Sequence, residues 1–109
     1  MTTIRAQLEE AAATAGDDPS KLICYFMDVS RSDISYRRGI TDPPIQHGTI
    51  EDLPAWEFSA GYGGVNGPPL IAFSKRYVYV QACYDGQEWV EAVPRHPKYA
   101  TFLPSLGGG

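Results

Sequence analysis

The residue types best suited to chemistry lie in a glycine-rich stretch, where Gly61, Gly63, Gly64 and Gly67 follow one another closely. Glycines allow backbone amides to approach a phosphate or another anion. A dinucleotide-binding loop also needs a strand before it and a helix after it. No helical pattern follows this stretch, and two prolines at 68–69 remove two backbone donors. We therefore expect a structural hinge or bulge between strands.

His47 and His96 are the only histidines in the sequence. A zinc site needs about four ligands, and neither a C-x-x-C nor an H-x-x-x-H spacing is present, so we predict no metal and no cofactor. A histidine acting as a general base needs an orienting carboxylate and a nucleophile nearby. The sequence contains no complete catalytic set, and we predict a protein that is not an enzyme. The alternative is a small enzyme or ligand-binding domain with a pocket joining His47, Gly63 and either Asp28 or Asp33.

Basic residues stand next to tyrosines in three places, at 36–38, 75–77 and 95–99. Such pairs are common in protein-binding hot spots, and they also stack on single-stranded nucleic acid. A third interpretation is that they are edge-strand charges that prevent aggregation. The formal net charge of −4 argues against direct binding of nucleic acid. The predicted partner-binding residues are Tyr36, Arg37, Arg38, Trp56, Tyr77 and Tyr79.

The acidic residues are concentrated in the first part of the chain. Residues 1–60 contain five Lys or Arg against ten Asp or Glu, whereas residues 61–109 contain four against three. This asymmetry suits either an acidic docking face or an ordinary solvated helix with loops. No stretch approaches the roughly 20 apolar residues of a membrane span, and no signal peptide is recognisable. We expect a cytoplasmic protein that does not contact a membrane.

The N-terminal segment has the spacing of an amphipathic helix. Ile4, Leu8 and Ala11 recur at helical intervals, Thr3 can cap the start, and Gly16 suits the left-handed position after the end. We predict a helix over residues 3–15. Residues 21–29 are nearly continuously apolar, which predicts a central strand that is buried on both faces.

The rest of the chain divides into an irregular part and a strand-rich part. Residues 30–54 are dense in Ser, Asp, Gly and Pro, which predicts a long irregular excursion and a first place to look for function. Strands are expected at 56–60, 70–73, 76–84 and 87–93. Cys24 and Cys83 lie in strand-like runs and are expected to be buried free thiols.

Asp85-Gly86 is a strong signal for a two-residue hairpin turn. This turn would pair Tyr84 with Gln87 and would divide the hairpin side chains between two faces. We predict that the more apolar face is the core: Val78, Val80, Ala82, Tyr84, Trp89 and Val93. The other face is mixed and Tyr-rich, as expected next to an edge, a loop or a partner: Tyr77, Tyr79, Gln81, Cys83, Glu88, Val90 and Ala92.

These elements predict a single α+β domain over residues 1–109. An N-terminal helix packs on an antiparallel sheet of about four or five strands, which ends in the tight hairpin. Residues 105–109 form a glycine-rich tail that we expect to be disordered.

The motifs of the second half resemble a group of small uncharacterised phage and prophage proteins. The resemblance covers roughly residues 56–97, and its motifs form turns and strands and contain no established catalytic residue. The motifs are Gly61-Tyr62-Gly63-Gly64, Gly67-Pro68, Val78-Tyr79-Val80 and Tyr84-Asp85-Gly86-x-Glu88-Trp89-Val90-x-x-Val93-Pro94-Arg95-x-Pro97.

The resemblance implies an accessory protein that acts in the cytoplasm of a bacterial host by stoichiometric binding of a host protein or complex. An inhibitor of a host defence system, similar in action to anti-CRISPR proteins, is one such function. A structural or assembly protein that works as a homo-oligomer is a further alternative.

Overall fold

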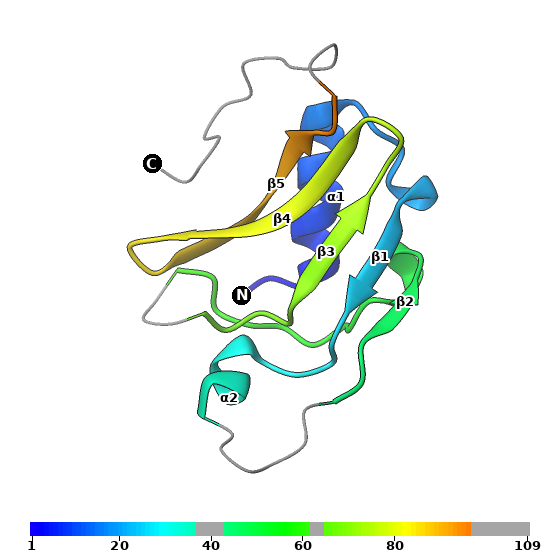
Figure 1. Ribbon diagram of the computed structural model, residues 1–109. Helices are drawn as coiled ribbons and strands as arrows, with labels where there is room; N and C mark the ends of the chain where they lie inside the picture. Colours follow the sequence, from blue (N-terminus) through cyan, green and yellow to red (C-terminus); the bar gives the residue numbers. More distant parts are fainter. Residues whose placement is uncertain (37–42, 62–64, 97–109) are drawn as a thin grey trace.

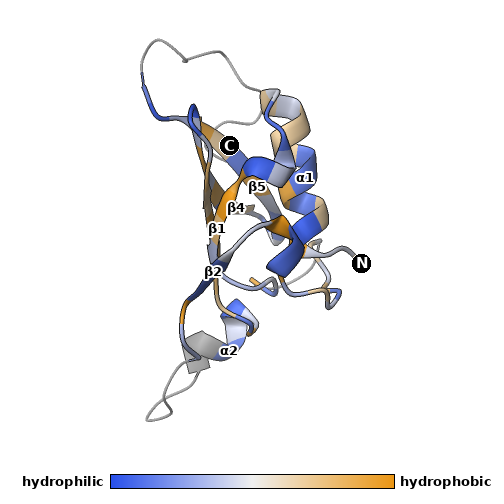
Figure 2. Ribbon diagram, turned by 90° about the vertical axis from the view of Figure 1, so that its right-hand side faces the viewer, coloured by the Kyte–Doolittle hydropathy of each residue, from blue (hydrophilic) through white to orange (hydrophobic). Residues whose placement is uncertain are grey.

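A computed structural model describes residues 1–36, 43–61 and 65–96, and the side chains of these residues except for 34–36. The elements are α1 (Ile4–Ala15), β1 (Ile23–Phe26), α2 (Arg31–Tyr36), β2 (Gln46–Gly48), β3 (Leu70–Phe73), β4 (Tyr77–Tyr84) and β5 (Gln87–Pro94), with short 3-10 turns at Pro19–Lys21 and Ile50–Asp52. The strands form one antiparallel sheet in the order β2-β1-β3-β4-β5. Helix α1 packs on one face of this sheet (Figures 1 and 2). The predicted α+β class is confirmed.

Helix α1 begins and ends at the residues that the sequence indicates. The Thr3 hydroxyl accepts a hydrogen bond from the Ala6 amide at 3.1 Å, and Gly16 adopts the left-handed conformation with φ of 79°. The buried side of the helix is formed by Ile4, Leu8, Ala11 and Ala12. Two of these four side chains are alanines, which allow the helix backbone to lie close to the sheet.

The predicted hairpin is confirmed with its register. Asp85 and Gly86 both have positive φ, at 50° and 82°, as a two-residue turn of this kind requires. Tyr84 is opposite Gln87, and the pairing continues without slippage to Tyr77 opposite Pro94.

The prediction of which hairpin face forms the core is wrong. The mixed face is the one that packs against α1. Its Tyr77, Tyr79, Val90 and Ala92 join a core with side chains from β1 and β3, namely Cys24, Phe26, Leu70 and Ala72. The face counted as more apolar lies on the opposite side of the sheet.

The mixed face can be buried because its polar groups find partners from distant segments. The Tyr79 hydroxyl donates to Asp17, just beyond α1, at 2.5 Å. The Gln81 side chain accepts from the Leu70 amide at 2.9 Å and donates to the Pro68 carbonyl at 2.6 Å. A buried polar group that is hydrogen-bonded costs far less than an unpaired one. A count of apolar residues along the strand does not include these partners.

Strand β1 lies inside the sheet, as predicted, but it is buried on only one face. Ile23 and Tyr25 are 54% and 41% exposed, whereas Cys24 and Phe26, which alternate with them, are buried. Cys24 is a buried free thiol, and burial together with the nearby charge of Asp52 raises its pKa to about 11. Cys83 is also a free thiol but is exposed, so the prediction that both are buried is wrong for Cys83.

The segment predicted to be irregular contains α2, β2 and the turn Ile50–Asp52. Strand β2 pairs with β1 and forms an edge of the sheet. The prediction of an irregular excursion is therefore wrong over much of its length. Conversely, the strand expected at 56–60 is reduced to a single bridge between Phe58 and Thr2. The predicted tail at 105–109 lies outside the described residues.

Candidate interaction surface

The face of the sheet opposite α1 presents mainly apolar side chains, and we call it the open face. Its members are Ile23 and Tyr25 on β1, Ile71 and Phe73 on β3, Val78, Val80 and Ala82 on β4, and Trp89 and Val93 on β5. They alternate along each strand with the core residues. No described helix lies over this face in the edge-on view of Figure 2.

The strand register arranges the open face in rows. One row runs across four strands through Ile23, Phe73, Val78 and Val93. The neighbouring row spans all five strands, as His47, Tyr25, Ile71, Val80 and Glu91. Because cross-strand neighbours are only about 5 Å apart, the side chains of these rows form one continuous surface.

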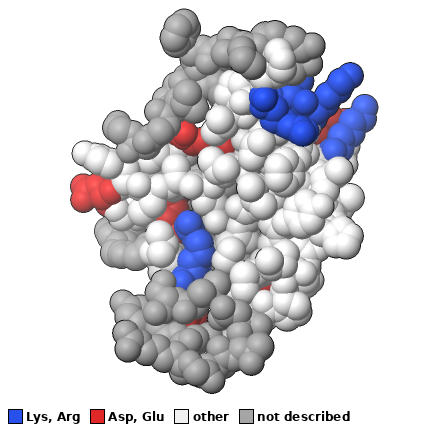
Figure 3. All heavy atoms as spheres, in the orientation of Figure 1, with Lys and Arg blue, Asp and Glu red and all other residues white. Residues whose placement is uncertain are grey.

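Several of these apolar side chains remain accessible. Besides Ile23 and Tyr25 on β1, Ile71 at the centre of the sheet is 38% exposed and Val93 on β5 is 36% exposed. Figure 3 shows a broad uncharged area on the same face, with Lys and Arg gathered at the upper right corner and a further basic group towards the lower left. Contiguous exposed apolar patches on small proteins commonly mark interaction sites.

Aromatic and charged groups border the open face. Tyr25 stacks on His47 with 5.9 Å between ring centroids, and it meets Phe73 edge to face at 6.0 Å. The Arg95 guanidinium lies 6.0 Å from the centre of the Phe73 ring, within cation–π range. At the opposite edge of the sheet, on β5, the Trp89 indole donates to Glu91 at 2.8 Å. Thus the face has an apolar centre and a polar rim, the usual composition of a protein interface.

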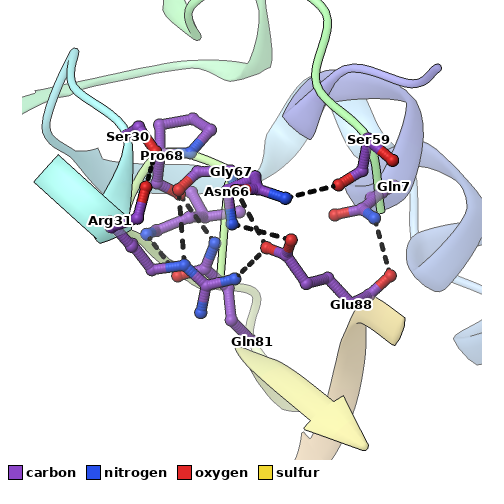
Figure 4. A network of polar contacts seen from close by, with 11 residues as sticks. Gln7, Ser30, Arg31, Ser59, Asn66, Gly67, Pro68, Gln81 and Glu88 are labelled. Carbon is purple, nitrogen blue, oxygen red and sulfur yellow. Dashed lines mark hydrogen bonds and ion pairs between the residues drawn. The ribbon is translucent and has the colours of Figure 1, made fainter. Parts of the chain in front are cut away.

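The glycine-rich stretch is bound to a carboxylate of the chain itself. The amides of Asn66 and Gly67 donate to the Glu88 carboxylate at 2.8 and 3.1 Å. Glu88 also forms an ion pair with Arg31 at the start of α2, as Figure 4 shows. Only 1% of the Glu88 side chain is exposed. Over its described part, this stretch therefore uses its amides to hold β5 and not an external anion.

Gly67 is also required for packing. A Cβ atom at this position would lie 2.8 Å from the Phe58 ring, which is closer than carbon atoms approach one another in proteins. The expectation of a structural role at this end of the stretch is consistent with both contacts. Residues 62–64, including Gly63 of the alternative pocket, lie outside the described residues.

The structure places the predicted partner-binding residues in different environments. Tyr77 and Tyr79 are 5% and 0% exposed, so their side chains pack in the core and do not reach the surface. Trp56 is half-buried, donates its indole N–H to Asp28 at 2.7 Å and packs edge to face on Phe58. The Tyr36 side chain, Arg37 and Arg38 lie outside the described residues.

Two expected members of the alternative pocket, His47 and Asp28, contact other residues. His47 stacks on Tyr25 at the sheet edge, and Asp28 accepts from Trp56. Within the described ranges, no group of three or more His, Cys, Asp or Glu side chains could hold a metal ion. Over the same part of the chain, no helix has the length and apolar character needed to cross a membrane.

Sequence reasoning did not single out the residues that form the centre of the open face, such as Tyr25, Ile71 and Phe73. Their alternation with Cys24, Phe26, Leu70 and Ala72 was the available signal. It shows that β1 and β3 have two faces, but it does not tell which face a helix covers.

Comparison with known proteins gives no relative: no protein-family model, no curated protein and no solved structure matches this chain.

Proposed function

We propose that this protein acts by stoichiometric binding of another protein and that the open face is its contact surface. The observation that supports the proposal is the location of the open face. Its side chains have the apolar character of a core, yet they lie on the side of the sheet that α1 does not cover. Exposed apolar surface is costly in water, and a protein partner that buries it gains that free energy.

The wider role within this proposal follows from the resemblance to phage and prophage proteins. A small accessory protein in a bacterial cytoplasm that binds a host protein, and thereby inhibits a defence system, is the specific version that we propose. It needs no catalytic group, and its rim of Arg95 and Lys75 would meet carboxylates on the partner. Direct binding of nucleic acid would be disfavoured by the net charge of −4.

The test is capture from a bacterial host lysate with matched variants. Ile71→Lys places a charge at the centre of the open face, whereas Ala13→Lys places the same charge on the exposed side of α1. We expect wild type and Ala13→Lys to retain one partner at a stoichiometric level, and Ile71→Lys to lose most of it. Equal retention by both variants would place the contact elsewhere. Failure of wild type to retain any partner would contradict the proposed function.

A further inference from the structure

The open face has features that suit one particular occupant, a second copy of this chain. We propose that, in the absence of another partner, two copies pair through their open faces in a two-fold sandwich. This inference rests on the proposed function insofar as both require the open face to be a protein-binding surface.

The size of the face is consistent with a dimer that dissociates. Strands β4 and β5 have eight residues each, and β1 and β3 have four. With a rise of about 3.3 Å per residue and a strand spacing of about 4.8 Å, the face covers roughly 400 Å² in projection. Side-chain relief increases the accessible area, so a pair of faces would bury about 1,200 Å² or less, at the lower end for specific interfaces. An interface of this size suits a dimer that dissociates on dilution.

The polar groups at the two ends of the central row are of different kinds, an exposed histidine ring at one end and at the other the carboxylate of Glu91, which is 8% exposed and accepts from Trp89. The row begins with His47 on β2 and ends with Glu91 on β5, at opposite edges of the sheet. A two-fold axis parallel to β3 reverses the strand order, so that His47 of one copy lies over Glu91 of the other, twice per dimer. Sheets stacked in this way keep their strands within about 30° of each other.

The other face-to-face arrangement is less favourable. A two-fold axis perpendicular to the strands preserves the strand order and places Glu91 over Glu91. Like charges opposed in an interface disfavour association, whereas the reversed order places a ring N–H near a carboxylate. In the reversed order the basic corners near Lys75 and Arg95 lie at the same end of the pair. Both residues are exposed, and water and salt screen exposed charges.

The reversed order also determines which residues meet. Tyr25 and Val80 lie on the strands on either side of β3, so Tyr25 of one copy faces Val80 of the other. Ile71 and Phe73 lie on β3 itself, next to the axis, and face their own counterparts. The centre of the interface is thus apolar and the polar groups lie at its margins, which is the arrangement of stable protein interfaces.

The first experiment measures the mass of the purified full chain by sedimentation or light scattering from about 1 µM to 1 mM. We expect the average mass to rise from one chain towards two, with Ala13→Lys unchanged and Ile71→Lys weakening association at least tenfold. A monomeric wild type over the whole range would overturn the second copy as occupant. Association that is equally strong in Ile71→Lys would do the same.

The second experiment tests the orientation in a Cys83→Ser background. An equimolar mixture of Tyr25→Cys and Val80→Cys should be joined into covalent heterodimers by a short bismaleimide, because these two positions face each other only in the reversed strand order, whereas Tyr25→Cys alone should not be cross-linked. Absence of cross-linking in a protein that does dimerise would overturn the reversed strand order.

The two proposals fail in different ways. If the protein is monomeric and Ile71→Lys abolishes capture of a host protein, the proposed function stands and a second copy is excluded as the occupant of the open face. If the protein dimerises and Ile71→Lys leaves capture unaffected, the second copy stands as the occupant and the open face is excluded as the site of host-protein binding.

Discussion

Glu88 shows how a single carboxylate can be buried at low cost when several segments supply donors. Arg31 and the amides of Asn66 and Gly67 surround its two oxygens, and the Gln7 side chain donates to its backbone carbonyl at 2.9 Å. Through these contacts one residue of β5 connects α1, the start of α2 and the glycine-rich stretch (Figure 4). Glu88 therefore has a structural role that its position on a strand does not suggest.

Glu88→Gln is expected to destabilise the protein by about 2–3 kcal/mol, because Arg31 loses its ion-pair partner in a largely buried site. Urea unfolding of the variant and of wild type measures this difference. Glu57→Gln is the control, since Glu57 is exposed, and it should change the free energy of unfolding by less than about 0.5 kcal/mol. A loss for Glu88→Gln as small as that of the control would contradict the role assigned to this network.

At the scale of elements, the end of α1 is joined to the sheet through Asp17. This carboxylate accepts from Tyr79 on β4 and from Arg76 at 3.1 Å, and Arg76 also donates to the Gly16 carbonyl at the end of the helix. Burial by itself would raise the pKa of Asp17, but hydrogen bonds from Ser74, Tyr79 and Arg76 outweigh this effect and lower the pKa below its usual value of 3.8. Burial, and then the hydrogen bond to Asp17, raise the pKa of Tyr79.

A lowered pKa in the folded state means that the ionised Asp17 stabilises the protein above the pKa of the unfolded chain. This contribution is lost as the pH falls below about 4, where Asp17 takes up a proton in the unfolded state first. We expect wild type to lose more stability between pH 5 and pH 3 than Asp17→Asn does, as measured by thermal unfolding at each pH. Parallel pH profiles for the two proteins would contradict this assignment.

At the scale of the whole molecule, the sheet has a covered face and an open face with similar apolar content. Leu70 and Ile71 are neighbours on β3, yet Leu70 is 7% exposed in the core and Ile71 is 38% exposed on the open face. This division is what makes the open face a candidate for partners and for a second copy.

Leu70→Ala and Ile71→Ala form a matched pair for this division. At dilute concentration, Leu70→Ala is expected to cost about 2–4 kcal/mol, because it leaves a cavity in the core. Ile71→Ala should cost less than about 1 kcal/mol in the monomer, because its side chain is already in contact with water. Chemical denaturation gives both values, and equal losses would mean that both faces are buried in the free protein.

Much of the fold follows from local patterns. The spacing of Ile4, Leu8 and Ala11 and the residues Thr3 and Gly16 define α1, and Asp85-Gly86 defines the hairpin and its register. These features depend on backbone conformations and periodicities that a few neighbouring residues determine. The α+β class could be predicted for the same reason.

The tertiary structure alone decided which face of the sheet is the core. Tyr79, Gln81 and Glu88 look like surface residues in the sequence. Tyr79 and Glu88 are buried and Gln81 is half-buried, because Asp17, Arg31 and Pro68 from other segments of the chain supply their hydrogen-bond partners. The valines opposite them look like a core and face outward. The free energy of burying a polar group depends on partners that only folding brings together, so the sequence determined the two faces of the hairpin but not which of them α1 covers.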